Sequence, residues 1–129
     1  MRIWDIPVNQ LCNKHLVAEH HETHCIYSVI TNGLKGFSHH PETERWRNKL
    51  GSLHLRHDQQ ALEIYRRGMR HHSGLPYIFH FSGWPKPWQS VEEQVRLLRE
   101  RCQQCRRNLE SGGYLKPSPE LLKEKGERL

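Results

Sequence analysis

Helical spacing over residues 8–31 constrains the fold of this 129-residue chain more than any other feature. Side chains that recur at alternating intervals of four and three residues lie on one face of an α-helix. The side chains on this face are Val8, Cys12, His15, Glu19, Glu22, Ile26 and Val29. Pro7 suits a first helical turn, and Asn32-Gly33 supplies a stop. The pattern predicts a helix with apolar ends and ionisable groups in its middle.

Two further segments show the same spacing. In residues 41–67 the face contains Trp46, Leu50, Leu53, His57, Ala61 and Ile64. We expect Gly51 to break or kink this segment. The third segment begins at Ser90, which forms a capping box with Glu93, and ends at Gly112-Gly113. The residues between the last two segments are rich in glycine, proline and aromatic side chains, which disfavours a helix.

These segments predict an all-α fold, a compact single domain of three main helices with long ordered loops. Strand signals are weak throughout, and the chain contains no internal repeat. We assign residues 1–112 to the helical domain and residues 113–129 to a C-terminal extension.

The composition favours a basic protein that meets nucleic acid. Twenty lysines and arginines against 14 aspartates and glutamates give a net charge of +6, and eleven histidines add to it near neutral pH. A soluble protein with a basic surface fits the same numbers. The chain has no run of roughly 18 apolar residues and no apolar signal region at its start. We therefore expect a cytoplasmic, nucleoid-associated protein with reduced cysteines and no membrane contact.

Two patterns raise the question of a metal. His21, Glu22 and Cys25 form H-E-x-x-C, which resembles a zinc-protease pattern. Further ligands would have to come from elsewhere, and no spacing specifies them. His20 and His24 also lie four residues apart, and the remaining ligands would have to come from His39, His40, His71 or His72. We favour a polar helix face over a metal site, with His20 and His24 on the surface or facing DNA.

The second pattern is the C-x-x-C pair Cys102 and Cys105 in the third segment. Both cysteines lie on the apolar stripe, where a thiol behaves as a small hydrophobic side chain. We favour core packing for this pair and predict no metal and no cofactor.

The N-terminal half carries a family resemblance. The stretches MRIWDIP and QLCNKHLVAEHHE, followed by SHHPETERW and ALEIYRRGMRHHS, resemble the pyrimidine-dimer DNA glycosylases of the phage endonuclease V type, in a small bacterial branch. The similarity extends over residues 1–75. Residues from Leu75 onward do not align with the phage enzyme.

The resemblance implies a DNA glycosylase with abasic-site lyase activity that needs no metal. In this family the nucleophile is the N-terminal α-amine, which corresponds to Met1, and the essential carboxylate corresponds to Glu22. Arg2 and His15 match other site positions. The chain departs from the phage pattern in keeping Met1, and in placing His21 and Cys25 where basic residues stand.

Other residues are candidates for binding DNA or supporting the site. Glu19 is a candidate second carboxylate or ion-pair partner of Arg2. His39-His40, at an expected helix start, suit a phosphate. The full set of candidates is Arg2, His15, Glu19, His21, His39, His40, Arg45, Arg70 and His71. Among the loop aromatics, Tyr77, Phe79 and Phe81 suit the core, and Trp84 and Trp88 suit an exposed stacking surface.

The sequence therefore predicts a monomeric enzyme that acts on damaged or modified pyrimidines in double-stranded DNA. Met1 would form a Schiff base with the sugar, and Glu22 would move the protons. Two alternatives remain: a His/Cys metal-dependent nuclease, and a DNA-binding module that keeps the fold without the chemistry.

Overall fold

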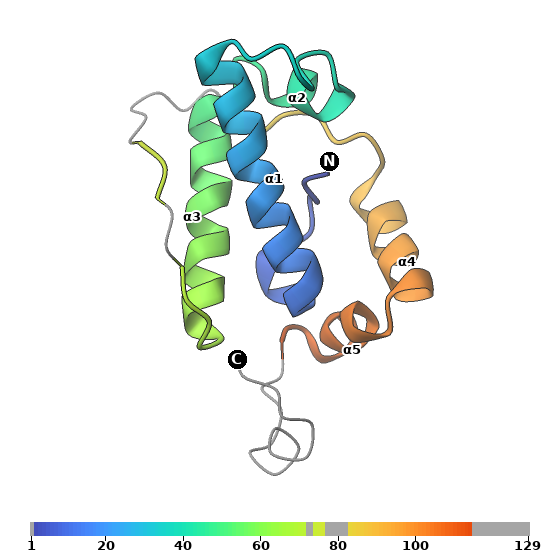
Figure 1. Ribbon diagram of the computed structural model, residues 1–129. Helices are drawn as coiled ribbons and strands as arrows, with labels where there is room; N and C mark the ends of the chain where they lie inside the picture. The colour runs from blue at the N-terminus through green and yellow to red at the C-terminus, as the bar shows by residue number, and fades with distance from the viewer. Residues whose placement is uncertain (1, 72–73, 77–82, 115–129) are drawn as a thin grey trace.

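The computed structural model describes residues 2–71, 74–76 and 83–114, and within these ranges all regular structure is helical. A 3₁₀ turn, η1, precedes five α-helices (Figure 1). The elements are η1 (Val8–Gln10), α1 (Asn13–Asn32), α2 (Pro41–Trp46), α3 (Leu50–Arg66), α4 (Val91–Arg101) and α5 (Gln103–Ser111). The predicted all-α class is confirmed.

The first predicted helix begins later than expected and ends where expected. Residues 8–10 form the 3₁₀ turn, and the extended Cys12 then caps α1 by accepting the backbone N–H of His15 at 3.4 Å. At the other end Gly33 adopts a left-handed conformation, with φ of 61°. Glycine enters this conformation without steric cost, which explains the clear stop.

Each of the other two predicted helices is divided in the structure. The break in residues 41–67 falls at 47–49, where Asn48 has φ of 63°, and Gly51 lies inside α3. The expected break at Gly51 was therefore wrong. Asparagine tolerates the left-handed region better than most residues, and this allows the turn. The third segment divides at the extended Cys102, whose sulfur caps α5 by accepting the N–H of Cys105.

The helices surround the start of the chain. α1 packs along α3, and α2 lies across one end of this pair (Figure 1). α4 and α5 lie across the N-terminal segment from α1 and α3. The N-terminal segment, residues 2–7, lies between α1 and α4. It contributes Ile3, Trp4 and Ile6 to the two core clusters, so that the residues before η1 are built into the core.

One buried carboxylate connects this segment to the helix pair. Glu19 on α1 is 1% exposed and receives the backbone N–H of Trp4 at 2.7 Å. The Glu19 carboxylate also accepts hydrogen bonds from two residues of α3, from Arg56 at 2.9 and 3.1 Å and from Gln60 at 2.6 Å. Arg56 in turn donates to the carbonyl of Ile6 at 2.8 Å. Glu19 is thus paired with Arg56, and not with Arg2 as one of our expectations had it.

Two further points concern the extent of the fold. Within the described residues, no helix is both long enough and apolar enough to cross a membrane. The proposed boundary at residue 112 stays a prediction: Gly112 ends α5 in a left-handed conformation, and residues 115–129 lie outside the described ranges.

Replacing Arg56 with methionine is expected to lower the free energy of unfolding by about 3–5 kcal/mol, because Glu19 would remain buried without its ion-pair partner. Urea denaturation measures the change. Arg47→Met is the matched control, because Arg47 pairs with Glu44 at the surface and should contribute less than about 1 kcal/mol. Equal losses in the two variants would contradict this account.

Candidate active site

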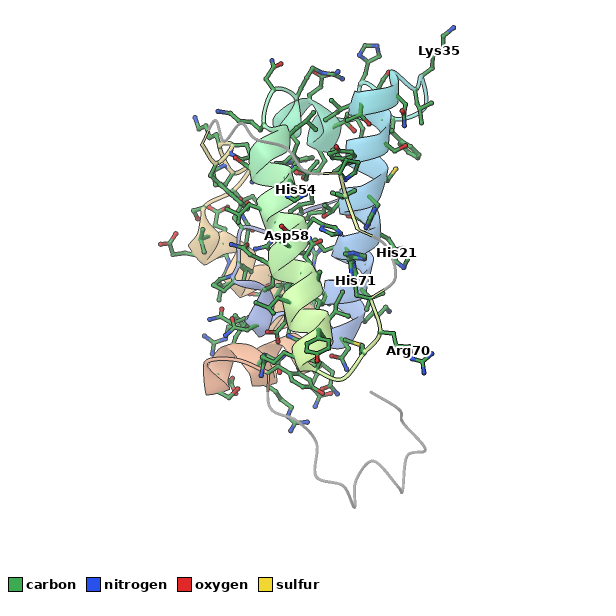
Figure 2. The ribbon with its side chains drawn as sticks, turned by 90° about the vertical axis from the view of Figure 1, so that its left-hand side faces the viewer. His21, Lys35, His54, Asp58, Arg70 and His71 are labelled. Atoms are coloured by element: carbon green, nitrogen blue, oxygen red, sulfur yellow. The ribbon has the colours of Figure 1, made fainter. Side chains whose placement is uncertain are left out.

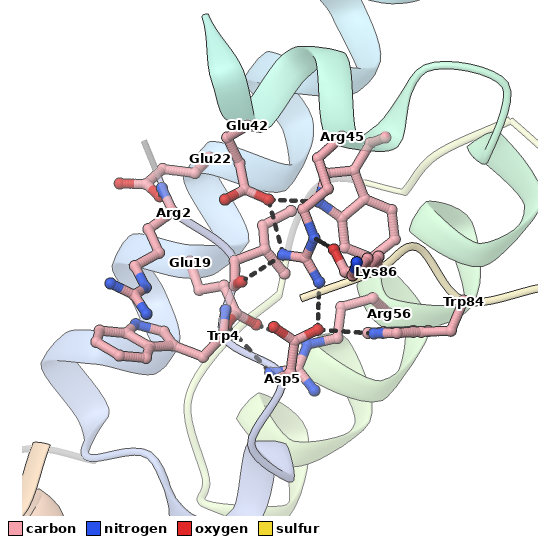
Figure 3. Close-up of polar contacts among 12 residues, drawn as sticks. Arg2, Trp4, Asp5, Glu19, Glu22, Glu42, Arg45, Arg56, Trp84 and Lys86 are labelled. Carbon is pink, nitrogen blue, oxygen red and sulfur yellow. Dashed lines mark hydrogen bonds and ion pairs between the residues drawn. The ribbon is translucent and has the colours of Figure 1, made fainter. Parts of the chain in front are cut away.

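The carboxylate of Glu22 lies at the start of the chain. It accepts the backbone N–H of Arg2, and the Glu22 side chain is half-buried on α1 (Figure 3). Met1, the predicted nucleophile, lies outside the described residues. Glu22 and Arg2 are thus two predicted site residues that the fold brings into contact.

The side chain of Arg2 is held away from Glu22. Its guanidinium lies over the ring of Trp4, 3.9 Å from the centroid, and donates to Gln89 Oε1 at 2.7 Å. Burial lowers the pKa of Arg2 from its usual value, and the carboxylates of Glu42 and Asp5 oppose that shift. The guanidinium is therefore fixed between Trp4 and Gln89.

Asp5 anchors the N-terminal segment to three other parts of the chain. Its carboxylate accepts Arg45, Trp84 Nε1 at 2.8 Å and Gln94 Nε2 at 2.9 Å. Its backbone N–H donates to Gln94 Oε1 at 2.8 Å. Because Gln94 belongs to α4, the segment that precedes α1 is fixed against a helix about ninety residues later in the chain.

Glu42 is a buried carboxylate that the sequence analysis did not select. It accepts Trp46 Nε1 at 2.7 Å and Arg45 Nη1 at 2.9 Å, while its Oε2 has no hydrogen-bond partner among the described residues. Burial raises the pKa of Glu42. Arg45 connects it to the N-terminal segment, because the Nη1 atom that donates to Glu42 also donates to the carbonyl of Ile3 at 3.1 Å. The signal in the sequence was the i,i+4 pair of Glu42 and Trp46 in the PETERW motif.

Arg45 serves this buried network. Its side chain is 6% exposed and bridges Asp5 and Glu42, and it also donates to the carbonyls of Ile3 and Lys86. The carboxylates of Asp5 and Glu42 neutralise the charge of Arg45. Arg45 therefore supports the N-terminal segment and does not contact a DNA phosphate. A buried arginine with several acceptors organises structure; it is not presented to DNA.

The two histidines before Pro41 have separate positions. His40 caps α2 through its Nδ1, which accepts the N–H of Glu42 at 3.1 Å. His39 is exposed and lines a shallow pocket of about 490 Å³ together with Lys35 and Arg47. The carboxylate of Glu44 also lines this pocket, 3.9 Å from His39, while His40 is engaged with the protein.

His21 and Arg70 are exposed and lie on one side of the molecule (Figure 2). In that view Arg70 extends outward from the chain that follows α3, and His21 lies on the outer face of α1. Trp84 and Trp88 are also exposed, at 37% and 52%. Tyr77, Phe79 and Phe81 lie outside the described residues.

His15 lies in a cysteine group and not beside Glu22. Its Nδ1 is 3.1 Å from Cys12 Sγ, 3.4 Å from Cys105 Sγ and 3.6 Å from Cys102 Sγ. Seven residues along a helix separate His15 from Glu22 by about 10 Å. The hydrogen bond from Cys105 and the neighbouring His15 lower the pKa of the Cys12 thiol.

The cysteine pair of the sequence analysis lies here. Cys105 is buried in the core, as expected, and Cys12 joins it there. The convergence with Cys12 and His15 was missed, because these residues are nearly ninety positions away from Cys102 in the chain.

His71 belongs to a second group, which contains four histidines. His20 Nε2 is 3.2 Å from His24 Nε2 and 3.0 Å from His71 Nε2, and the His57 ring lies against all three. His20 is buried, contrary to the surface position expected for it. Burial and the neighbouring histidines lower the pKa of His20 to about 3. The H-E-x-x-C pattern contributes neither His21 nor Cys25 to this group.

The comparison with protein families assigns the chain to one of them. The family model for pyrimidine dimer DNA glycosylases matches residues 1–76, more than half of the chain. The protein belongs to the pyrimidine dimer DNA glycosylase family, and this membership indicates a DNA glycosylase-type function. The searches of curated proteins and of solved structures found no match.

Arg45 and Arg70 are expected to respond in opposite ways to substitution. Arg45→Met leaves two buried carboxylates unpaired and should lower the free energy of unfolding by about 3–5 kcal/mol. Arg70→Gln should change stability by less than about 0.5 kcal/mol. Because Arg70 is a predicted phosphate contact, its substitution should also reduce the salt dependence of DNA binding by about 0.9 in the log–log slope.

Urea denaturation and fluorescence anisotropy over a series of salt concentrations measure these two effects. If the Arg45→Met variant kept full stability and its DNA binding depended less on salt, Arg45 would be a phosphate contact and not part of the buried network.

Proposed function

We propose that the protein is a DNA glycosylase with abasic-site lyase activity, in which the α-amine of Met1 is the nucleophile and Glu22 the catalytic carboxylate. The substrate is double-stranded DNA that carries a pyrimidine dimer or another damaged pyrimidine, bound by a monomer of the protein in the nucleoid.

The contact between Glu22 and the backbone N–H of Arg2 carries this proposal. The α-amine of Met1 is only a few covalent bonds from that nitrogen, so a carboxylate on Arg2 N–H is within reach of the amine as well. An α-amine has an unperturbed pKa of about 7.7–8.0, against about 10.4 for lysine. A substantial fraction is therefore neutral and nucleophilic at physiological pH.

The reaction proceeds in balanced steps. The lone pair of the neutral amine forms a bond to the anomeric carbon C1′, while the C1′–N1 bond to the pyrimidine breaks and its electron pair leaves with the base. Glu22 accepts the proton that the amine loses. The C1′–O4′ bond then opens, O4′ receives a proton, and the sugar is held as a cationic Schiff base.

Lyase activity follows from the same intermediate. A base removes a C2′ proton, the C3′–O bond breaks, and the 3′ phosphate leaves with that electron pair. Water then hydrolyses the Schiff base and restores the amine. The carboxylate of Glu22 lies against the start of the chain, where negative charge stabilises the iminium.

The protein offers groups that suit an extruded nucleotide. An enzyme that attacks C1′ within a duplex has to displace the base or its partner from the stack. The indoles of Trp84 and Trp88 are exposed, and Trp84 is fixed by Asp5, the same residue that anchors the N-terminal segment. The indoles supply stacking surfaces, and the exposed His21, His39 and Arg70 supply contacts to phosphates.

Borohydride trapping tests the mechanism. The full-length protein is mixed with duplex DNA that contains one abasic site, and a parallel reaction uses a thymine dimer. Reduction should give a covalent adduct, and mass spectrometry of its peptides should place the DNA on Met1. Removal of the α-amine by transamination should abolish the adduct. An adduct on a lysine would sink the Met1 mechanism.

Glu22→Gln should reduce turnover by about 10²–10⁴-fold with little change in DNA affinity, because the amide retains the shape and loses the proton acceptor. Glu44→Gln is the control, since Glu44 is exposed and paired with Arg47. Strand cleavage without any adduct would favour a metal-dependent nuclease. Binding with neither adduct nor cleavage would favour a non-catalytic DNA-binding module.

A further inference from the structure

Four side chains with metal-binding chemistry meet where the start of α1 contacts the turn between α4 and α5. The ligating atoms of Cys12, His15, Cys102 and Cys105 all lie within 4.8 Å of one another. The cysteines are thiols and form no disulfide. Cys12 Sγ and Cys102 Sγ are 3.8 Å apart, almost twice the length of an S–S bond.

Hydrogen bonding alone does not account for this arrangement. A single imidazole nitrogen carries either one proton or one lone pair, yet His15 Nδ1 lies 3.1–3.6 Å from all three sulfurs. Convergence of three sulfurs on one nitrogen is the arrangement that a common central ion produces.

The distances match a tetrahedron around zinc. Zn–S bonds of about 2.3 Å and Zn–N bonds of about 2.0–2.1 Å place two sulfurs about 3.8 Å apart, and a sulfur and a nitrogen about 3.6 Å apart. The observed S···S distance is 3.8 Å, and two of the three S···N distances are 3.4 and 3.6 Å.

The local backbone also suits thiolate ligands. The residues form C-x-x-H and C-x-x-C pairs, each at the beginning of a helix. Sulfur accepts backbone N–H groups in three places: His15 to Cys12 at 3.4 Å, and Cys105 to Cys102 and Cys12 to Cys105 at 3.3 Å. Such hydrogen bonds and the helix N-termini stabilise negative sulfur.

We propose that Cys12, His15, Cys102 and Cys105 bind one Zn²⁺ as a structural site. Because four protein ligands complete the tetrahedron, no position is left for water or substrate. The ion would join α1, within the family match, to α4 and α5, which lie beyond it. α4 carries Gln94, and Gln89 precedes it, so zinc would fix the helices that hold Asp5 and Arg2.

A second, independent set of contacts supports another site. His20 and His24 lie four residues apart on α1, His57 comes from α3, and His71 follows α3; their ligating atoms are also within 4.8 Å of one another. Four Zn–N bonds of about 2.0–2.1 Å place nitrogens about 3.3 Å apart. The observed Nε2 separations from His20 are 3.2 and 3.0 Å.

One neighbour orients a ligand of this second site. Asp58 Oδ1 lies 3.1 Å from His57 Nδ1, and carboxylates commonly orient metal-binding histidines in this way. We propose a second Zn²⁺ at these four histidines, with a role in holding α1, α3 and the chain after α3 together. His20 and Glu22 lie on nearly opposite faces of α1, so this site is separate from the active site.

Metal analysis of the full-length protein tests both sites. Plasma mass spectrometry should find about two zinc ions per chain. Cys105→Ser should lose the first ion and keep the second, and His57→Ala should do the reverse. Cys25→Ser and His21→Ala are the matched controls, since neither residue belongs to a group, and both variants should keep two ions.

Cobalt spectra of the wild-type protein test both sites even if a variant fails to fold. Protein refolded with Co²⁺ should show thiolate-to-cobalt charge transfer from the cysteine site, together with strong visible bands of tetrahedral cobalt. The Cys105→Ser variant should lose the charge-transfer band and retain the visible bands of the histidine site. Absence of charge transfer in the wild type overturns the first proposal, and one metal equivalent with all bands thiolate-derived overturns the second.

Neither result depends on the glycosylase mechanism. Metal content is measured on the resting protein, and the borohydride adduct reports on Met1. A protein without zinc that still forms the adduct would retain the proposed function and lose the metal sites.

Discussion

The buried ion pair between Glu19 and Arg56 is the interaction on which the other contacts depend. Glu19 belongs to α1 and Arg56 to α3, and together they also hold the backbone of residues 4 and 6. Moving two charges out of water is unfavourable unless every lone pair finds a donor. Here Gln60 and the N–H of Trp4 complete the set, so the pair specifies one position for the N-terminal segment. The contact between Glu22 and Arg2 follows from that position.

The sequence reveals α1 and its ionisable face because helical spacing is a local property. It also identifies Glu22 and Arg2 through a family motif. The sequence does not distinguish the buried ion-pair role of Glu19 from the contact of Glu22 with Arg2, because both glutamates lie on the same face of the predicted helix. Their difference depends on what packs against each turn of α1, and those partners come from α3 and from residues 2–6.

The features that the sequence did not predict correctly depend on backbone conformation or on contacts between distant segments. The break at residues 47–49 comes from a left-handed Asn48, which asparagine permits but does not require. The position of Arg45 follows from burial beside two carboxylates, and neither neighbour is marked by spacing. The cysteine and histidine groups bring together residues from distant segments. Such convergence becomes visible only when the helices are placed in space.

The central position of the N-terminal segment has a consequence for how the chain is made. Arg2, Asp5 and Cys12 contact residues that follow them by 87, 89 and 93 positions. On the ribosome these first residues emerge long before Gln89, Gln94 and Cys105 exist. The contacts of residues 2–12 with α4 and α5 therefore form only after those helices have been synthesised. A chain that ended before Gln89 would leave Arg2, Asp5 and Cys12 without these partners.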